Sequence, residues 1–152
     1  MLTIYIDADA CPVKDETYVV ATRYGVPVAL VANSRMYVPE GFGVDLILVE
    51  AGPDAADDWI AENVRASDVV VTADLPLAAR CLAAGAHVLG TNGREFSSES
   101  MGDLLATREL KSQLRGAGVM SGGPPPLAQK DRSRFQSKLD ELVQRRLREQ
   151  RS

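Results

Sequence analysis

Short apolar runs alternate with segments of helical periodicity over the first ninety residues, and this alternation limits the folds open to the chain. The apolar runs cover residues 2–7, 26–32, 44–50, 68–74 and 86–90, and the helical segments cover residues 13–25, 52–66 and 75–85. Strands that are apolar on both faces and connected through helices are typical of a parallel sheet with helices on each side. The pattern predicts a three-layer α/β/α fold with a mainly parallel sheet of about five strands.

The C-terminal third differs in composition from the part before it. We expect one helix over residues 97–114, a loop rich in Gly and Pro over 116–128, and a last helix from about Gln129 to Glu149. This divides the chain into an α/β domain of residues 1–115, a loop of residues 116–128 and a basic helical segment of residues 129–152. We expect the last helix to be part of the same domain.

The composition is that of an ordinary globular protein. The chain has 152 residues, of which 45% are hydrophobic and 25% charged, and no apolar run approaches the ~18 residues that span a membrane. The first apolar run is interrupted by Asp7 and follows no basic residue, unlike a secretory signal, so we expect a cytoplasmic protein without membrane contact. Cys11 and Cys81 have no CxxC spacing, which favours reduced thiols over a disulfide or a zinc site.

Acidic and basic residues are unevenly distributed. The net charge of −4 combines −9 over residues 1–100 with +5 over residues 101–152. A basic segment of this kind is either a solvated helix face or a surface that binds a polyanion, and RNA or single-stranded nucleic acid is then the expected partner. The candidate phosphate contacts in the last helix are Lys130, Arg132, Arg134, Lys138, Arg145, Arg146 and Arg148.

Aspartates follow three of the predicted strands. Asp7 and Asp9 come after the first run, Asp74 comes after "VVVT", and "DAADD" opens the helix after the third run. The carboxyl ends of parallel strands lie at one edge of a sheet, where functional groups of open α/β folds collect. In "DAADD" the residues Asp54, Asp57 and Asp58 have the spacing of one helix face. The topology therefore predicts an acidic site at this edge.

Three of these aspartates, Asp9, Asp54 and Asp74, have a simpler interpretation as helix caps when each is taken alone. Convergence argues for function, because two carboxylates ~4 Å apart repel by roughly 4 kcal/mol at an effective dielectric of about 20. Mg²⁺ or Mn²⁺, which prefers oxygen ligands, relieves this repulsion. We therefore predict a metal site with the ligands Asp7, Asp54, Asp57, Asp58 and Asp74, and catalytic roles for Asp7, Asp9, Asp57 and Asp74.

Other side chains are weaker candidates for binding phosphate or substrate. These are Lys14, Ser34, Arg35, Thr72, Asn92, Arg108 and Arg134. The only histidine, His87, lies in an apolar run and is expected to be a packing residue. Cys11 lacks the Cys-x5-Arg spacing of thiol phosphatases, because Thr17 stands at the position of the arginine. The pattern therefore favours metal-assisted phosphodiester hydrolysis over histidine or cysteine chemistry.

Three motifs carry a resemblance to a known family. "YIDADACPVK", "DAADDWI" and "VVVTADLPLAA" resemble the YaiI/YqxD family of bacterial proteins, which is similar to PIN-like domains. The resemblance runs over nearly the whole chain and implies an α/β/α fold and a Mg²⁺- or Mn²⁺-dependent nuclease that cuts RNA. It implies that Asp7, Asp57 and Asp74 are the acids of the site. PIN nucleases often have a further acid after the next strand, where the first acid here is Glu95.

Two other function classes remain open. "IDADACP" also fits the D-x-D of haloacid dehalogenase phosphatases, with Asp7 as nucleophile and Thr72 as the strand-end threonine, although the acidic pair Asp57 and Asp58 then precedes the threonine instead of following it. The second alternative is a binding module without catalysis, in which the acids hold a structural ion or a basic partner. The oligomeric state does not follow from the sequence.

Overall fold

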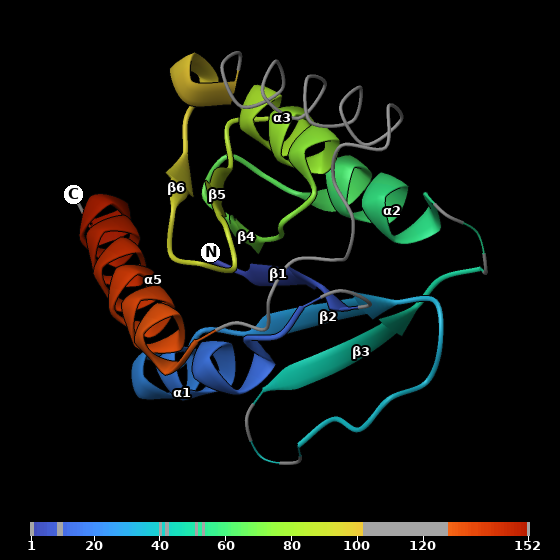
Figure 1. The fold of residues 1–152 in the computed structure, drawn as a ribbon, viewed down its shortest axis with the longest axis horizontal. Helices are drawn as coiled ribbons and strands as arrows, with labels where there is room; N and C mark the ends of the chain where they lie inside the picture. The colour runs from blue at the N-terminus through green and yellow to red at the C-terminus, as the bar shows by residue number, and fades with distance from the viewer. Residues whose placement is uncertain are drawn as a thin grey trace, which may run out of the picture.

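The computed structural model has one sheet between two layers of helices (Figure 1). It describes residues 2–8, 11–39, 41, 43–50, 52, 54–101 and 128–151. The strands are β1 (Ile4–Asp7), β2 (Val28–Ala32), β3 (Val44–Leu48), β4 (Val69–Val71), β5 (His87–Leu89) and β6 (Glu95–Phe96). The helices are α1 (Lys14–Tyr24), α2 (Ala55–Asn63), α3 (Leu75–Ala83) and α5 (Gln129–Arg151). The predicted fold class is confirmed.

The sheet has the strand order β3-β2-β1-β4-β5-β6. The strands β1 to β5 are parallel, and only β6 pairs in the antiparallel direction, with β5. The chain first builds outward from β1 to β3 and then restarts at β4 on the other side of β1. The strand order therefore reverses between β1 and β4, which is where open α/β sheets form their binding crevice.

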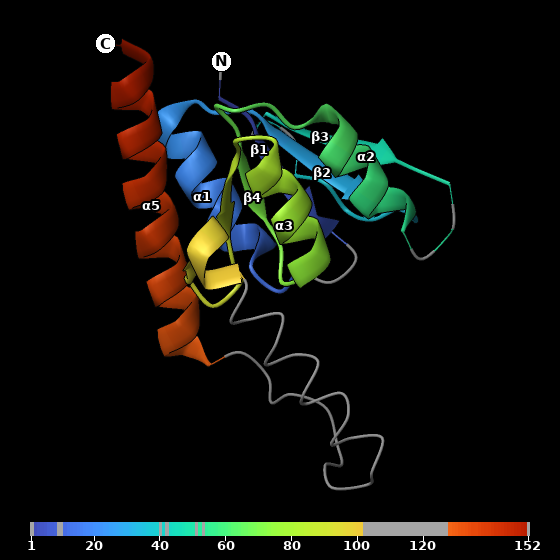
Figure 2. The same cartoon turned by 90° about the horizontal axis from the view of Figure 1, so that it is seen from above.

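Two apolar cores fill the layers. On one face, α1 packs with α5 over the sheet, and Phe135, Leu139 and Val143 of α5 are completely buried there. On the other face, α2 covers β1 and β2 and α3 covers β5, through residues such as Ile60, Leu77 and Cys81. Figure 2 shows α5 running alongside α1, opposite α2 and α3. None of the described helices is long and apolar enough to cross a membrane.

The last helix begins at the edge of the sheet where the parallel strands end. The turn at Gly93, after β5, has a φ of 90°, and a Cβ at this position would lie 3.1 Å from the backbone nitrogen of Phe135. Glycine is therefore required both by the backbone conformation and by the close approach of α5. At its other end, Arg146 donates a hydrogen bond to the carbonyl oxygen of Ala66, which precedes β4. The helix thus runs antiparallel to the strands.

Three details differ from the sequence-based expectations. The strand β6 was not expected, because two residues are too short to show a periodic pattern. The run 68–74 is a strand only at Val69–Val71, because Thr72 to Asp74 turn into the cap of α3. The expected helix over 97–114 is helical at residues 98–101. Its remainder, and the expected loop except for Ala128, lie outside the described residues.

Candidate functional site

Asp7 ends β1 in the middle of the sheet, and its carboxylate contacts the neighbouring strand exit. The Thr72 hydroxyl, which follows β4, donates a hydrogen bond of 3.3 Å to Asp7 Oδ2. The same hydroxyl oxygen accepts a hydrogen bond of 3.0 Å from the Asp74 backbone N–H. Thr72 is only 1% exposed, so both contacts hold its hydroxyl in one orientation. Thr72 therefore connects the ends of β1 and β4 at the point where the strand order reverses.

Asp74 is the N-cap of α3, as its position before "LPLAA" indicated. Its Oδ1 accepts a hydrogen bond of 2.9 Å from the backbone N–H of Leu77. A carboxylate has room for several such contacts, so the cap role leaves Oδ2 available as a ligand atom. The cap also fixes the side chain at the edge that Asp7 occupies. Capping and a place in the site are thus compatible for this residue.

Asp57 connects the first turn of α2 to the same acidic edge. Its pKa rises from 3.8 to about 6, first because of burial and then because of the nearby carboxylates of Asp7, Asp74 and Asp54, in that order. The positive charge of Arg80 lowers the pKa of Asp57, but this is the smallest of the contributions. The hydrogen bonds through Thr72 bring the exits of β1 and β4 together, and the contributions of Asp7 and Asp74 to the raised pKa place Asp57 in their neighbourhood. We call Asp7, Asp57, Asp74 and Thr72 the acidic edge.

The remaining two acids of "DAADD" differ from Asp57 in their surroundings. Asp54 occupies the N-cap position of α2, but its side chain accepts no cap hydrogen bond, so the simple cap interpretation is wrong for its carboxylate. Asp58 forms an ion pair of 2.7 Å with Arg80 of α3, and both side chains are about half exposed. Asp58 is therefore balanced by a neighbouring helix, whereas Asp57 faces other acids. Asp9 lies outside the described residues.

The chemistry of this edge fits a hard divalent ion better than a soft one. Its donors are carboxylate oxygens and one hydroxyl, which are the ligand types of Mg²⁺ and Mn²⁺. Burial and then the neighbouring carboxylates raise the pKa of Asp57, so a bound cation would favour its charged form. Within the described ranges, no three Asp, Glu, His or Cys side chains are arranged as a complete metal site.

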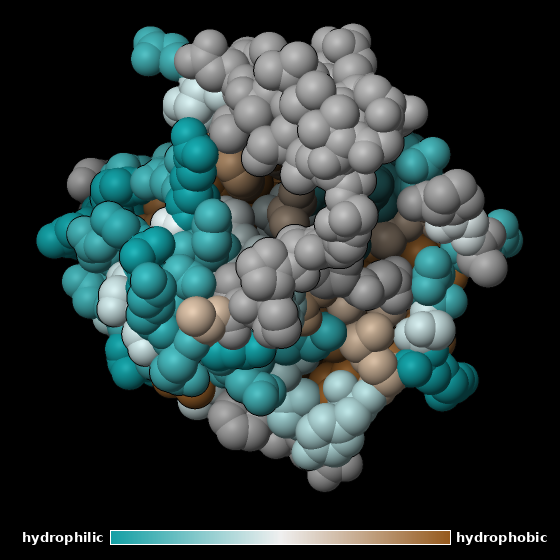
Figure 3. Space-filling view, viewed as in Figure 1, coloured by the Kyte–Doolittle hydropathy of each residue, from teal (hydrophilic) through white to brown (hydrophobic). Residues whose placement is uncertain are grey.

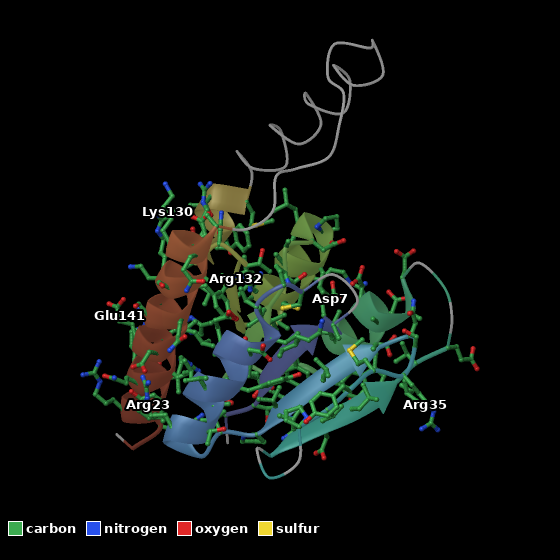
Figure 4. All side chains as sticks on the ribbon, turned by 60° about the horizontal axis from the view of Figure 1, so that its bottom comes forward. Asp7, Arg23, Arg35, Lys130, Arg132 and Glu141 are labelled. Carbon is green, nitrogen blue, oxygen red and sulfur yellow. The ribbon has the colours of Figure 1, made fainter. Side chains whose placement is uncertain are left out.

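The predicted substrate-binding residues are scattered around this edge. Lys14, in the first turn of α1, donates a hydrogen bond of 3.1 Å to the carbonyl oxygen of Cys11. Asn92 accepts a hydrogen bond from the Arg94 backbone N–H, and it lies in the turn that packs against α5 beside Arg134. Figure 4 shows Arg35 pointing away from Asp7. Ser34 is exposed after β2, and Arg108 lies outside the described residues.

Neither the cysteines nor the histidine lie in a reactive setting. Burial raises the pKa of the Cys11 thiol to about 11 and that of Cys81 to about 12. Thiols with such pKa values are poor nucleophiles at neutral pH. His87 is the first residue of β5, at the edge opposite the acidic edge, and burial followed by Arg146 lowers its pKa. His87 is 3.7 Å from Glu95, which also pairs with Arg145, so Glu95 does not extend the acidic edge.

Most basic side chains of α5 have partners within the chain. Arg132 bonds to the Pro12 carbonyl oxygen at 2.6 Å and pairs with Glu16 at 3.3 Å, so it fastens α5 to the start of α1. Arg145 pairs with Glu95 at 2.7 Å. The other pairs are those of Arg134 with Asp131, Lys138 with Glu141 and Arg146 with Glu149. Lys130 and Arg132 are labelled near the start of this helix in Figure 4.

Comparison with known proteins assigns the chain to a family. The family model described as "Uncharacterized BCR, YaiI/YqxD family" matches residues 5–145. The chain belongs to the YaiI/YqxD family. This family match spans most of β1, the whole acidic edge and most of α5, so it includes both the site and the helix that packs on the other face of the sheet.

Individual relatives agree with the family match. The chain is 54% identical to the UPF0178 protein of Bradyrhizobium diazoefficiens over 93% of this chain and 85% of the relative. It is 52% identical to the UPF0178 protein of Paramagnetospirillum magneticum over 94% of this chain and 95% of the relative. No solved structure matches the chain.

Two features of the site did not emerge from the sequence. Arg80 pairs with Asp58 only because α2 and α3 pack side by side, and no local pattern links residues 22 positions apart. The role of Thr72 as a bridge likewise depends on β1 and β4 being neighbours, with Asp7 and Thr72 65 positions apart. Its position directly after a buried strand was the only signal that the sequence offered.

Proposed function

We propose that this YaiI/YqxD protein is a Mg²⁺- or Mn²⁺-dependent hydrolase that cuts phosphodiester bonds in RNA or single-stranded nucleic acid. One observation carries the proposal. Thr72 joins the exits of β1 and β4 by hydrogen bonds to Asp7 and from the Asp74 N–H, and Asp57 of a third segment lies near enough for both carboxylates to add to the rise in its pKa that burial causes. Structural caps have no need to converge, whereas a metal site requires convergence. The three sequence motifs resemble the YaiI/YqxD family, and the similarity of that family to PIN-like domains, many of which are nucleases, supports the same chemistry.

The residues have distinct roles in this proposal. Asp7, Asp57 and Asp74 would hold the ion through carboxylate oxygens. A bound divalent ion supplies Lewis-acid chemistry that activates water and stabilises charge on the phosphate. The Thr72 hydroxyl positions Asp7 through the 3.3 Å hydrogen bond, and the cap contact with Leu77 holds Asp74 at the edge. Lys14 supplies a cation next to this group that could contact a substrate phosphate.

A cleavage assay with matched variants tests the proposal. Labelled single-stranded and duplex RNA are incubated with Mg²⁺, Mn²⁺ or EDTA and with wild type, Asp7→Asn or Asp74→Asn. Asp45→Asn is the control, because Asp45 is an exposed acid on β3 outside the acidic edge. We expect cleavage that requires metal and falls by roughly 100-fold or more in the two site variants, as expected when a metal ligand is lost. The control should cleave at the wild-type rate.

The outcomes separate the proposal from its alternatives. Cleavage that is equal in all four proteins, or equal with EDTA, would indicate a contaminating enzyme and remove the proposal. If Mn²⁺ raises the melting temperature of wild type but no substrate is cut, the chain is a metal-binding module without catalysis.

A phosphatase of the haloacid dehalogenase type is the second candidate. The Thr72–Asp7 hydrogen bond favours it, because that chemistry requires a strand-end threonine beside the nucleophilic aspartate. Its test is a phosphoryl group trapped on Asp7 after incubation with a phosphomonoester. Asp57 and Asp58 precede Thr72 in the chain, which is the reverse of the order that this superfamily uses.

A further inference from the structure

We propose that the groove between α1 and the segment after β2 binds an unpaired base of the nucleic-acid strand whose phosphate enters the acidic edge. The groove is lined by Lys14, Asp15, Tyr18, Val19, Tyr37 and Pro39 and has a volume of about 380 Å³. We call it the base groove. The proposal rests on the nuclease function proposed above and adds a feature by which the protein would prefer single-stranded substrates to duplexes.

Exposed apolar surface is concentrated at the base groove. The described residues leave three large apolar side chains exposed, and two of them line this groove: Val19 is 44% exposed and Tyr37 is 85% exposed. An aromatic ring so exposed has lost little of its hydration and is free to stack on a ligand. Base stacking on an aromatic side chain contributes about 1–3 kcal/mol per base and tolerates any base. Figure 3 shows apolar atoms at the surface over β3 and the segment that leads to it.

The wall of the base groove also contains a polar atom without a partner. Tyr18 is 7% exposed, and its hydroxyl is enclosed with no hydrogen-bond partner among the described residues. Leaving a buried hydroxyl unpaired costs about 1–3 kcal/mol. Because this hydroxyl is enclosed, a base would reach it only after Tyr18 turns toward the groove, and the polar edges of the base would then supply the missing partner. The exposed ring of Tyr37 is the feature that favours a base over a lipid or an aliphatic chain.

Lys14 and Cys11 relate the base groove to the acidic edge. Lys14 lines the groove and donates a hydrogen bond to the carbonyl oxygen of Cys11. Burial raises the pKa of the Cys11 thiol, with a smaller contribution from the nearby Asp7, and burial also raises the pKa of the Tyr18 phenol, with a smaller contribution from the nearby Cys11. Cys11 thus lies between the two sites. Lys14 is a cation between the base groove and the acidic edge. It would contact a phosphate of the strand that lies between the bound base and the bond to be cut.

Binding measurements test the inference independently of cleavage. A labelled single-stranded oligonucleotide and its duplex are titrated by fluorescence anisotropy, with Ca²⁺ replacing Mg²⁺ or Mn²⁺, and the strand is checked for integrity afterwards. We expect Tyr37→Ala to weaken single-strand binding by about 10-fold, within the range for one stacked base. Tyr37→Phe keeps the ring and should bind as wild type does. Duplex binding should be the same in all three proteins.

Two further variants separate stacking from charge and from general surface loss. Lys14→Gln should weaken the binding of both single strands and duplexes. It should also reduce the dependence of affinity on salt concentration by the amount expected for about one phosphate contact. Tyr37→Ala should leave this salt dependence unchanged. Leu48→Ala removes the third exposed apolar side chain, on β3 outside the groove, and should bind normally. Circular dichroism of each variant confirms that it is folded.

The outcomes distinguish this inference from the nuclease proposal. If Tyr37→Ala binds single strands as tightly as wild type while wild type still cuts RNA, the base groove is wrong and the nuclease proposal stands. If Tyr37→Ala and Tyr37→Phe weaken binding equally, the effect is not stacking and the inference is overturned. Binding that depends on the Tyr37 ring in a protein without cleavage would retain the groove and remove the nuclease. Absence of both binding and cleavage would remove both.

Discussion

The acidic edge and helix α5 carry opposite net charge and differ in how their charged side chains are paired. At the acidic edge, Asp57 faces two or more other carboxylates, and its pKa rises to about 6. On α5, Asp140 accepts hydrogen bonds from Tyr24, Arg23 and Gln144, and these contacts lower its pKa. The acidic edge brings carboxylates close to one another, whereas α5 pairs its charged side chains with groups of opposite charge or with hydrogen-bond donors.

This difference indicates which region is built for stability and which for chemistry. Repulsion between acids costs folding free energy and is retained where a ligand relieves it. Ion pairs and hydrogen bonds between α5 and α1 instead connect two parts of one core. Contacts within the chain therefore account for most of the described basic side chains of α5, which formed part of the suggested polyanion-binding arm. The predictions below test this contrast, from the largest expected effect to the smallest.

The largest effect should come from the buried face of α5. Phe135 is completely buried in the core between α5, α1 and the sheet. Phe135→Ala should lower the free energy of unfolding by about 3–5 kcal/mol, because it removes a large buried side chain and leaves a cavity. Urea denaturation measures the change. The matched control is Ser137→Ala, an exposed position on the same helix, for which we expect less than about 0.5 kcal/mol.

A small effect of Phe135→Ala would reverse the contrast between the regions. If the free energy of unfolding of this variant is within about 1 kcal/mol of the wild-type value, α5 is not part of the cooperative core. Its basic residues would then be available as a separate binding arm.

The next effect compares one aspartate from each region. In EDTA at pH 8, Asp57→Asn should stabilise the protein by about 1 kcal/mol after allowance for solvent screening, because it removes a repelled charge. Asp140→Asn should destabilise it by about 1 kcal/mol, because it weakens charged hydrogen bonds. Thermal melts over a pH series measure both variants against wild type.

The pH dependence of these two variants follows from their pKa shifts. Folding raises the pKa of Asp57 from 3.8 to about 6, so wild type has the full stability of the protonated group below about pH 4 and loses it as pH rises through 6. The advantage of Asp57→Asn should therefore vanish toward pH 4. Asp140 has a lowered pKa, so its contribution is present above about pH 4 and is lost as pH falls through the folded value. Shifts of equal sign in the two variants would contradict the contrast.

The smallest effect concerns an exposed ion pair of α5. Arg145 pairs with Glu95 at 2.7 Å, and both side chains are more than 40% exposed. Arg145→Gln should lower stability by about 0.2–1 kcal/mol at low salt and by less at high salt. If it instead reduces oligonucleotide binding severalfold with unchanged stability, the α5 surface takes part in the nucleic-acid site.

Much of the layout could be predicted from local sequence, and the reasons are physical. Apolar runs bounded by turn residues marked the five parallel strands, and helical spacing marked α1, α2, α3 and α5. Strand β6 has only two residues and no period to detect. For the site, the positions of Asp7 and Asp74 after strands indicated a shared edge. The separation of Asp57 from Asp58, which differ only by one position, depends on which of them α3 reaches with Arg80.

By itself, the sequence determined the α/β class, the parallel strands and the edge to which the strand-end aspartates belong. These properties follow from the period of apolar residues and from the direction of parallel strands. The tertiary structure alone decided that β1 and β4 are neighbours, that Thr72 contacts Asp7, and that Tyr37 and Tyr18 share a groove. Such contacts join residues far apart in the chain, and their free energy arises only when the helices and the sheet are packed together.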